Sequence, residues 1–193
     1  MKTRDHFVLG QYLINNCAAP MLRRHRKAFL LGCIELDFNI FSYLRGMRRY
    51  KKFHGHNAEN SFMFLVHCAD VFDENAPRSA WDYFRLGTAI HYIADAFTAS
   101  HNGFWTGSLL EHSAYETALH REFKAMLESA CPEQIQRREY APLHRVYRTE
   151  KHNVEIDFRY ILTACLSAMR KYVLGAAEQE EAYDASFNYG RPA

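Results

Sequence analysis

The chain has 193 residues, of which 48% are hydrophobic and 24% charged, so it is long enough to form one domain around a substantial core. No run of about 18 apolar residues is present, which excludes a transmembrane helix. Gln11, Asn15 and Asn16 interrupt the segment after the charged start, which argues against a secretory signal. We therefore expect a cytoplasmic protein with a single domain over residues 1–193.

Charge is unevenly distributed, although the net charge is only +2. Residues 1–52 contain eleven Lys and Arg against three Asp and Glu, and the remainder contains thirteen against nineteen. The basic first third favours attraction to an anion such as a phosphate group, or else pairing with the acidic remainder. The five cysteines are widely spaced, without a Cys-x-x-Cys pair, which favours buried thiols over disulfides or a zinc knuckle.

Apolar residues recur with helical spacing in five long segments. Asp5 and Ser79 are candidate N-caps of two of them. Residues 28–36 form a further apolar segment, and residues 132–148 are expected to form a polar, basic loop. No segment combines period-two alternation with hairpin turns, so the sequence predicts an all-α bundle of five to seven helices. The five long helices are expected at residues 5–16, 58–73, 80–99, 108–130 and 153–176.

Two groups of possible ligands precede the second long helix. Asp37 directly follows an apolar segment, where an acid is seldom buried without a partner, and its alternative role is to cap the segment after it. A basic loop over residues 45–52 then leads to His54 and His56. These two histidines flank Gly55, which lets the backbone turn closely.

The third long predicted helix carries the strongest sign of chemistry. Residues four apart on a helix lie on one face, so His91 and Asp95 can bind one metal ion. His112 and Glu116 repeat this spacing on the next helix, and His101 lies at the helix end between the two pairs. Imidazole and carboxylate together suit zinc. One such pair is common by chance, but two pairs joined by a third histidine favour a metal site.

Spacing excludes several other metal and catalytic architectures. No Glu is followed by a His three residues later, as a ferritin-like di-iron site requires. No His directly precedes an Asp, which excludes the phosphohydrolases built on that doublet. The zinc-protease pattern His-Glu-x-x-His, the phosphate-binding Gly-x-x-x-x-Gly-Lys loop and the Gly-x-Ser-x-Gly elbow are also absent.

The order and spacing of these residues resemble the zinc-dependent phospholipase C family, which shares its fold with the P1-type nucleases. Leu86-Gly-Thr-Ala-Ile-His-Tyr-Ile-Ala-Asp95 is similar to the family's Leu-Gly-x-x-x-His-Tyr-x-x-Asp segment, and His101 stands at its following histidine. His112-Ser-Ala-Tyr-Glu116 is similar to its His-x-x-Tyr-Glu motif. Upstream, Asp5-His-Phe-Val-Leu resembles the N-terminal helix with the first His ligand, and Ile34-Glu-Leu-Asp37 resembles the segment with an early Asp ligand.

The resemblance implies a helical bundle of the phospholipase C/P1 nuclease type that holds two or three zinc ions. His56 is preferred to His54 because Gly55-His56-Asn57 is similar to the intracellular bacterial branch of the family. In secreted relatives an N-terminal Trp chelates the third ion, whereas this chain starts at Met1, so we expect the third ion to be weak, differently ligated or absent. One ion would be held by Asp37, His56, His91 and Asp95, a second by His101, His112 and Glu116, and a third by His6 with Asp95 as a bridge.

The implied activity is hydrolysis of a phosphoester bond by a metal-activated water, with Asp37 as the catalytic carboxylate that orients the water. The substrate would be a small phosphoester or phospholipid, without stable membrane insertion, because the C-terminal lipid-binding domain of some relatives is missing. One alternative is a P1-type nuclease or nucleotide phosphoesterase, for which nucleic acid is a partner only as substrate. Another is a non-catalytic, metal-stabilised helical binding module. The sequence leaves the oligomeric state open.

Overall fold

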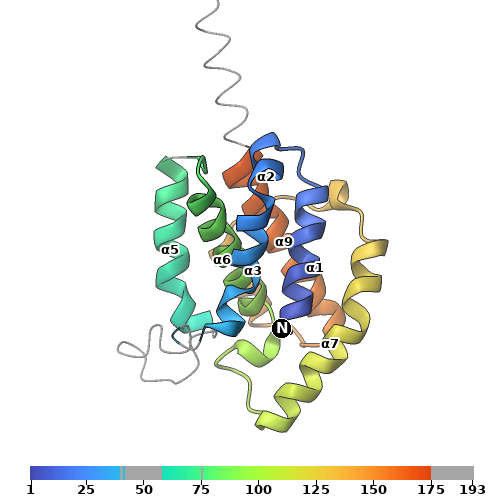
Figure 1. Ribbon diagram of the computed structural model, residues 1–193. Helices are drawn as coiled ribbons and strands as arrows, with labels where there is room; N and C mark the ends of the chain where they lie inside the picture. Colours follow the sequence, from blue (N-terminus) through green and yellow to red (C-terminus); the bar gives the residue numbers. More distant parts are fainter. Residues whose placement is uncertain (40, 42–57, 75, 175–193) are drawn as a thin grey trace, which may run out of the picture.

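The computed structural model of the chain describes residues 1–39, 41, 58–74 and 76–174 (Figure 1). Those residues form eight α-helices and contain no β-strand, which confirms the predicted all-α bundle. The short helices α2 and α8 raise the number above the expected five to seven. In chain order the helices are α1 (Thr3–Asn15), α2 (Pro20–Arg24), α3 (Arg26–Phe38), α5 (Ala58–Glu74), α6 (Ala80–Ala96), α7 (Leu109–Ser129), α8 (Tyr140–Tyr147) and α9 (Val154–Met169).

Side-chain caps determine where three of the long helices begin. Ser79 and Ser108 precede α6 and α7, and each hydroxyl accepts a hydrogen bond from the backbone N–H three residues further on. Asp82 and Glu111 accept hydrogen bonds from the serine backbone N–H groups in return, which completes two capping boxes. Asn153 is the N-cap of α9, and its side chain accepts a hydrogen bond from the backbone N–H of Ile156 without a reciprocal bond. The predicted Ser79 cap is therefore confirmed.

Helices α3 and α6 touch each other backbone to backbone. A Cβ atom on Gly32 would lie 2.0 Å from the carbonyl oxygen of Phe84, and one on Gly87 would lie 2.1 Å from that of Phe29. Only a hydrogen atom fits at either position, so both helices need glycine here to pack this closely. The contact holds α6 rigidly against α3.

Helix α6 runs through the centre of the bundle, with α3, α5 and α9 packed around it (Figure 1). Twelve of its 17 residues are buried, including large apolar side chains such as Leu86 and Ile90, each of which contributes roughly 1.5–3 kcal/mol on burial. His91 and Asp95 are buried in the same helix, where polar groups need partners. Figure 1 shows the N-terminus of the chain at the end of the bundle where α3 and α6 finish.

The structure corrects three expectations. The stretch predicted to be a polar loop contains the 3-10 turn η3 (Pro132–Gln134) and helix α8. Pro142 lies in the first turn of α8, where its missing N–H costs no helical hydrogen bond. Helix α1 begins two residues before Asp5, which lies in its first turn and is not the N-cap. The helical spacing of Trp81 and Leu109 predicts core positions, but both side chains are exposed. They lie in the first turns of their helices, and periodicity does not show which helix end projects beyond its neighbours.

Two further sequence expectations concern membranes and thiols. No helix among the described residues is both long enough and apolar enough to cross a lipid bilayer. All five cysteines are described and none forms a disulfide, which confirms one part of the prediction. Four of the thiols are buried, as expected, and Cys131 is exposed.

Candidate metal centre

His91 and Asp95 lie one turn apart on the same buried face of α6, as their spacing predicts. The Nδ1 atom of His91 lies 2.8 Å from the backbone carbonyl oxygen of Cys33 on α3. A carbonyl oxygen can only accept, so Nδ1 carries a proton and Nε2 faces the interior. Metal-binding histidines are commonly oriented in this way by a protein oxygen on the second nitrogen.

Asp95 lies at the centre of the site. Its Oδ1 atom is 2.9 Å from the α-amino nitrogen of Met1 and 3.2 Å from Nε2 of His6. Its Oδ2 atom is 3.1 Å from Nε2 of His91 and 3.6 Å from Nδ1 of His101. Burial acts to raise the pKa of Asp95, but these four basic groups outweigh it and hold the pKa well below its usual range. The carboxylate is therefore ionised, and both of its oxygens face basic nitrogens.

His6 on α1 also reaches Asp95. Its ring stacks on that of His91, with centroids 3.7 Å apart and planes 9° from parallel. Burial and the nearby His91 lower the pKa of His6 to about 4 despite the attraction of Asp95, so the imidazole is neutral at pH 7, the form that binds metal. His6, His91 and Asp95 each offer a ligand atom within 4.8 Å of the others, and we call them the first cluster.

A second cluster forms where the turn after α6 meets α7. His101 belongs to the 3-10 turn η2 (Ala99–His101), and its Nε2 lies 2.9 Å from Oε1 of Glu116. The Nε2 of His112 lies 3.3 Å from the same oxygen. Burial acts to raise the pKa of Glu116, but hydrogen bonds from the two histidines lower it far below its usual range. His101, His112 and Glu116 also offer ligand atoms within 4.8 Å of one another.

The α-amino group of Met1 lies between the two clusters, a position that sequence reasoning did not anticipate. Its nitrogen is 2.9 Å from Oδ1 of Asp95, 3.1 Å from Oε1 of Glu116 and 3.0 Å from Nε2 of His101. Burial acts to lower its pKa, but the two carboxylates outweigh it and raise the pKa to about 10. The amine is therefore a buried cation that both clusters share.

The two clusters fit zinc. The two ring nitrogens of His6 are buried without a hydrogen-bond partner in the protein, which is costly for an imidazole unless a ligand uses them. The Nε2 of His101 faces both a carboxylate oxygen and the Met1 ammonium, and one nitrogen cannot donate to the first and accept from the second at the same time. Imidazole nitrogens and carboxylate oxygens in groups of three are the ligands of catalytic zinc sites, which keep a further position for water or substrate.

Two other predicted ligands are not among the members of these clusters. Asp37 lies in the last turn of α3, half-buried, with its Oδ1 atom 3.7 Å from Nε2 of His91. It therefore lies next to the first cluster, on the side of α3. His56, and His54 as its alternative, lie outside the described residues, so their roles stay predictions.

Helices α1 and α7 are also joined beside the site by a hydrogen bond between His120 and Asp5. The Nδ1 atom of His120 lies 2.6 Å from Oδ1 of the buried Asp5. Asp5 directly precedes His6, so the pair holds the start of α1 against α7. The sequence leaves His120 as a supporting or surface residue, and its contact is with α1.

Asp157 on α9 positions the second cluster from outside it. This fully buried carboxylate accepts hydrogen bonds from the backbone N–H of Ala99 (2.7 Å), the hydroxyl of Tyr115 (2.8 Å) and the hydroxyl of Tyr147 (2.7 Å). Ala99 belongs to η2 and Tyr115 to α7, so Asp157 ties both elements of the cluster to α9. Burial raises its pKa to about 6 although these hydrogen bonds act to lower it. Sequence reasoning missed Asp157 because an acid in the first turn of a helix is an ordinary feature.

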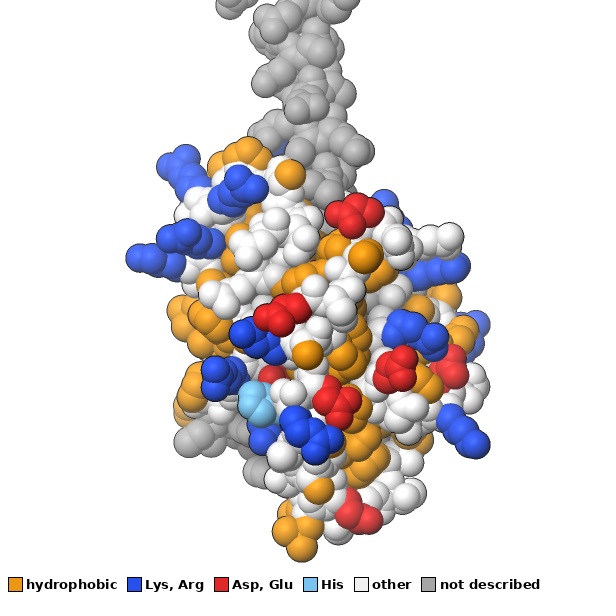
Figure 2. Space-filling view, turned by 90° about the vertical axis from the view of Figure 1, so that its right-hand side faces the viewer, with side chains coloured by type: hydrophobic (Ala, Val, Ile, Leu, Met, Phe, Trp, Pro, Cys, Tyr) orange, Lys and Arg blue, Asp and Glu red, His pale blue; other side chains and the backbone are white. Residues whose placement is uncertain are grey.

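Within the basic N-terminal third, the run of residues 23–27 lies away from the clusters. Residues 23–27 span the end of α2 and the start of α3, whereas Asp37 lies about 16 Å further along α3 at 1.5 Å per residue. Figure 2 shows the face of the molecule around α7, on which Lys and Arg side chains lie among Asp and Glu side chains. The basic run 23–27 therefore does not line either cluster, and residues 45–52 lie outside the described residues.

The arrangement is a helical bundle in which α1, α6, η2 and α7 bring imidazole nitrogens and carboxylate oxygens, the candidate metal ligands, together at one end of the core. The family model for zinc-dependent phospholipase C matches residues 5–174, a range that contains both clusters. The chain therefore belongs to the zinc-dependent phospholipase C family, which confirms the resemblance seen in its motifs. No curated protein and no solved structure matches the chain.

Proposed function

We propose that the protein is a zinc-dependent hydrolase of phosphodiester bonds, of the phospholipase C type, and that the two clusters hold its two or three zinc ions. The observation that carries the proposal is the meeting of the clusters at Asp95. Its carboxylate reaches His6 and His91 of the first cluster and His101 of the second. Membership of the zinc-dependent phospholipase C family supports the choice of metal and of reaction.

Zinc bound at these clusters would polarise a phosphoryl oxygen and lower the pKa of a bound water toward about 7, giving hydroxide at neutral pH. The surrounding protein sets the orientation and the protonation state of these candidate ligands. The carbonyl of Cys33 orients His91, burial keeps His6 neutral, and surrounding basic groups keep Asp95 ionised. Burial also strengthens the electrostatic interactions of each ligand.

We propose Asp37 as the carboxylate that orients the attacking water and accepts its proton. It lies next to His91 at the end of α3, where its side chain is 16% exposed. Phe38 follows it directly, and Phe38 and Phe41 are 72% and 78% exposed. Exposed phenyl rings beside the site offer a surface for an apolar part of the substrate.

The test is hydrolysis of bis(p-nitrophenyl) phosphate by zinc-loaded protein, together with its zinc content by elemental analysis. A chelator should abolish turnover and added zinc should restore it. Asp95→Asn should lower zinc affinity and activity by at least about 100-fold, because losing even an outer-shell partner costs 10–100-fold. Asp70→Asn, an exposed position on α5, is the matched control. Stoichiometric zinc without turnover of this substrate, phosphatidylcholine or single-stranded DNA would instead identify a metal-stabilised binding module.

The exposed rings of Phe38 and Phe41 also favour a second candidate, a P1-type nuclease or nucleotide phosphoesterase. Base stacking on an aromatic side chain is worth about 1–3 kcal/mol per base. Rates on phosphatidylcholine, single-stranded DNA and nucleoside monophosphates at equal zinc would separate the candidates. A nuclease would lose far more activity on DNA than on bis(p-nitrophenyl) phosphate in Phe38→Ala.

A further inference from the structure

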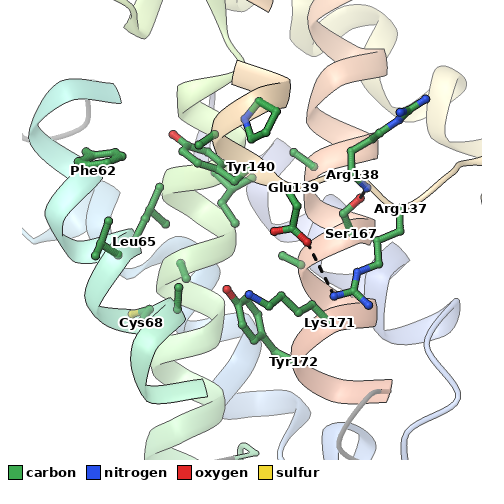
Figure 3. Close-up of a pocket in the computed structure, with 18 residues that line it drawn as sticks. Phe62, Leu65, Cys68, Arg137, Arg138, Glu139, Tyr140, Ser167, Lys171 and Tyr172 are labelled. Atoms are coloured by element: carbon green, nitrogen blue, oxygen red, sulfur yellow. Dashed lines mark hydrogen bonds and ion pairs between the residues drawn. The ribbon is translucent and has the colours of Figure 1, made fainter. Parts of the chain in front are cut away.

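A cavity of about 470 Å³ lies on the opposite side of α6 from the metal clusters. Helices α5, α6 and α9 enclose it, and the start of α8 lies at one end (Figure 3). Ala89 and Ile93 line it from α6, and each lies two residues from His91. Residues two apart on a helix point in nearly opposite directions, so this cavity and the clusters use opposite faces of α6. Its volume falls within the range of roughly 300–1,000 Å³ that is usual for small-molecule sites.

Small side chains at facing positions create the cavity. Ala69 on α5, Ala89 on α6, and Ala164 and Ala168 on α9 all line it, and no side chain reaches beyond Cβ at these points to fill the space between the helices. Phe62 on α5, whose spacing predicts an inward position, lines the cavity and is 42% exposed. An apolar stripe of α5 therefore faces a hollow, where close packing is expected.

Charged side chains gather on the side of the cavity opposite α5. Figure 3 shows the apolar side chains of α5 on one side and Arg137, Glu139 and Lys171 on the other. Arg137 and Glu139 lie 4.0 Å apart and are both exposed, so their ion pair is weak. Lys171 lies 5.1 Å above the ring centre of Tyr172. Arg138 also lines the cavity, but its guanidinium points away from it in Figure 3, so Lys171, beside the Arg137–Glu139 pair, gives this side its positive charge.

We propose that the cavity binds a single-chain anionic amphiphile, with its alkyl chain between α5, α6 and α9 and its anionic head near Lys171 and Arg137. The aliphatic wall has few groups able to hydrogen-bond a peptide backbone, so an extended peptide would bury N–H and C=O groups without partners. An alkyl chain has no such groups. The positive side of the cavity selects an anionic head over a neutral or cationic one. The proposal does not depend on the hydrolase activity, because it uses none of the cluster residues.

The test measures binding of dodecyl phosphate, below its critical micelle concentration, to the full chain by isothermal titration calorimetry. We expect saturable binding of one molecule per chain that is unchanged by chelator. Dodecyltrimethylammonium should bind at least about tenfold more weakly, which corresponds to losing about 1.4 kcal/mol of head-group attraction. Lys171→Glu should weaken the binding of dodecyl phosphate by a similar factor. Lys151→Glu, an exposed position in the loop before α9, is the matched control and should bind like the wild type.

Location is tested separately from affinity. A diazirine-bearing alkyl phosphate should label residues 62–69, 137–142 and 164–172 on photolysis, and Ala168→Phe should reduce this labelling by filling the cavity. Circular dichroism shows whether that variant is folded, and if it is not, the labelling map of the wild type decides. No binding, equal binding of the cationic amphiphile, or chelator-sensitive labelling of η2 and α7 would overturn the proposal. A chain-to-chain crosslink that blocks labelling would instead assign the cavity to a second copy of the chain.

Discussion

At the scale of single residues, the site is governed by charges that share a buried space. Asp95 and Glu116 place two carboxylates close to the α-amino group of Met1, whose pKa is raised to about 10. A metal ion that binds the same oxygens competes with this ammonium, so binding must displace its proton or the amine itself. Uptake of zinc at neutral pH would therefore either release a proton from the Met1 amine or move the amine away from the two carboxylates.

Extending the chain by Gly-Ser before Met1 tests how much the contacts of the Met1 amine contribute to the free energy of unfolding. The extension moves the ammonium away from Asp95 and Glu116 and leaves two buried carboxylates with less compensation. We expect the chelated protein to lose about 3 kcal/mol of unfolding free energy, the usual cost of removing one partner from a buried charge pair. Urea unfolding measures the loss, and the same dipeptide added at the C-terminus is the control. Equal stability of the two extended chains would show that the Met1 amine is not part of the site.

His6 sets a pH dependence for the chelated protein. Its pKa is about 4 in the folded chain, because burial disfavours the charged ring, against about 6.5 when unfolded. The unfolded chain therefore binds more protons between these values, and stability is lost as the pH falls from 6.5 toward 4. At about 1.4 kcal/mol per pKa unit the loss reaches about 3 kcal/mol. The raised pKa of His91 acts in the opposite direction and offsets part of it.

Urea unfolding between pH 7 and pH 5 measures this dependence above the range in which most carboxylates titrate. His6→Gln should flatten the slope, since it removes the buried titrating ring. His67→Gln, an exposed position on α5, should keep the slope of the wild type. A slope that survives in His6→Gln would assign the pH dependence to other groups.

At the scale of secondary-structure elements, the local sequence sets the spacing of candidate ligands along one helix. Contacts between helices then set where those ligands lie relative to one another. Asp157 shows this most clearly, because it accepts three hydrogen bonds that join η2, α7 and the segment of α8 to α9. Asp157→Ala would leave the N–H of Ala99 and the hydroxyls of Tyr115 and Tyr147 buried without an acceptor. Each such loss costs about 1–3 kcal/mol, so we expect at least about 3 kcal/mol of destabilisation.

The same substitution should also weaken zinc binding, because η2 carries His101. Unfolding in urea and zinc content after dialysis are the two measurements. Glu155→Ala changes an exposed acid in the same first turn of α9 and should leave both unchanged. A variant that loses stability but keeps full zinc affinity would limit Asp157 to a structural role.

Local chemistry explains which elements could be predicted from sequence. Capping residues and helical spacing place α6 and α7 within a few residues, and with them the pairs His91–Asp95 and His112–Glu116. The position of Met1 and the role of Asp157 could not be read in this way, since both depend on contacts with residues far away in the chain. Helix α8 was not predicted because its segment belongs to a polar, basic stretch that was expected to form a loop, and its Pro142 is compatible with the first helical turn.

At the scale of the whole molecule, the two clusters take their ligands from α1, α6, η2 and α7, whereas α8 and α9 supply none of the residues in the clusters. Zinc that binds only the folded chain stabilises it by about 4 kcal/mol when its free concentration is 1,000 times Kd. The stabilisation should not be uniform, because only some elements lose a ligand bond when the metal leaves.

Hydrogen exchange with and without chelator tests this distribution in the protein as a whole. Without metal, the first turn of α1, the turn η2 and the first half of α7 should lose protection most, since the proposed ligand bonds that join them are then absent. Helix α9 should lose little, because none of its side chains belongs to either cluster and most of its core side chains are apolar. Lys151→Glu, remote from the clusters, should reproduce the wild-type pattern. A uniform loss of protection, equal in α9 and α7, would mean that metal acts only through global unfolding. The four elements that carry the clusters would then not unfold locally.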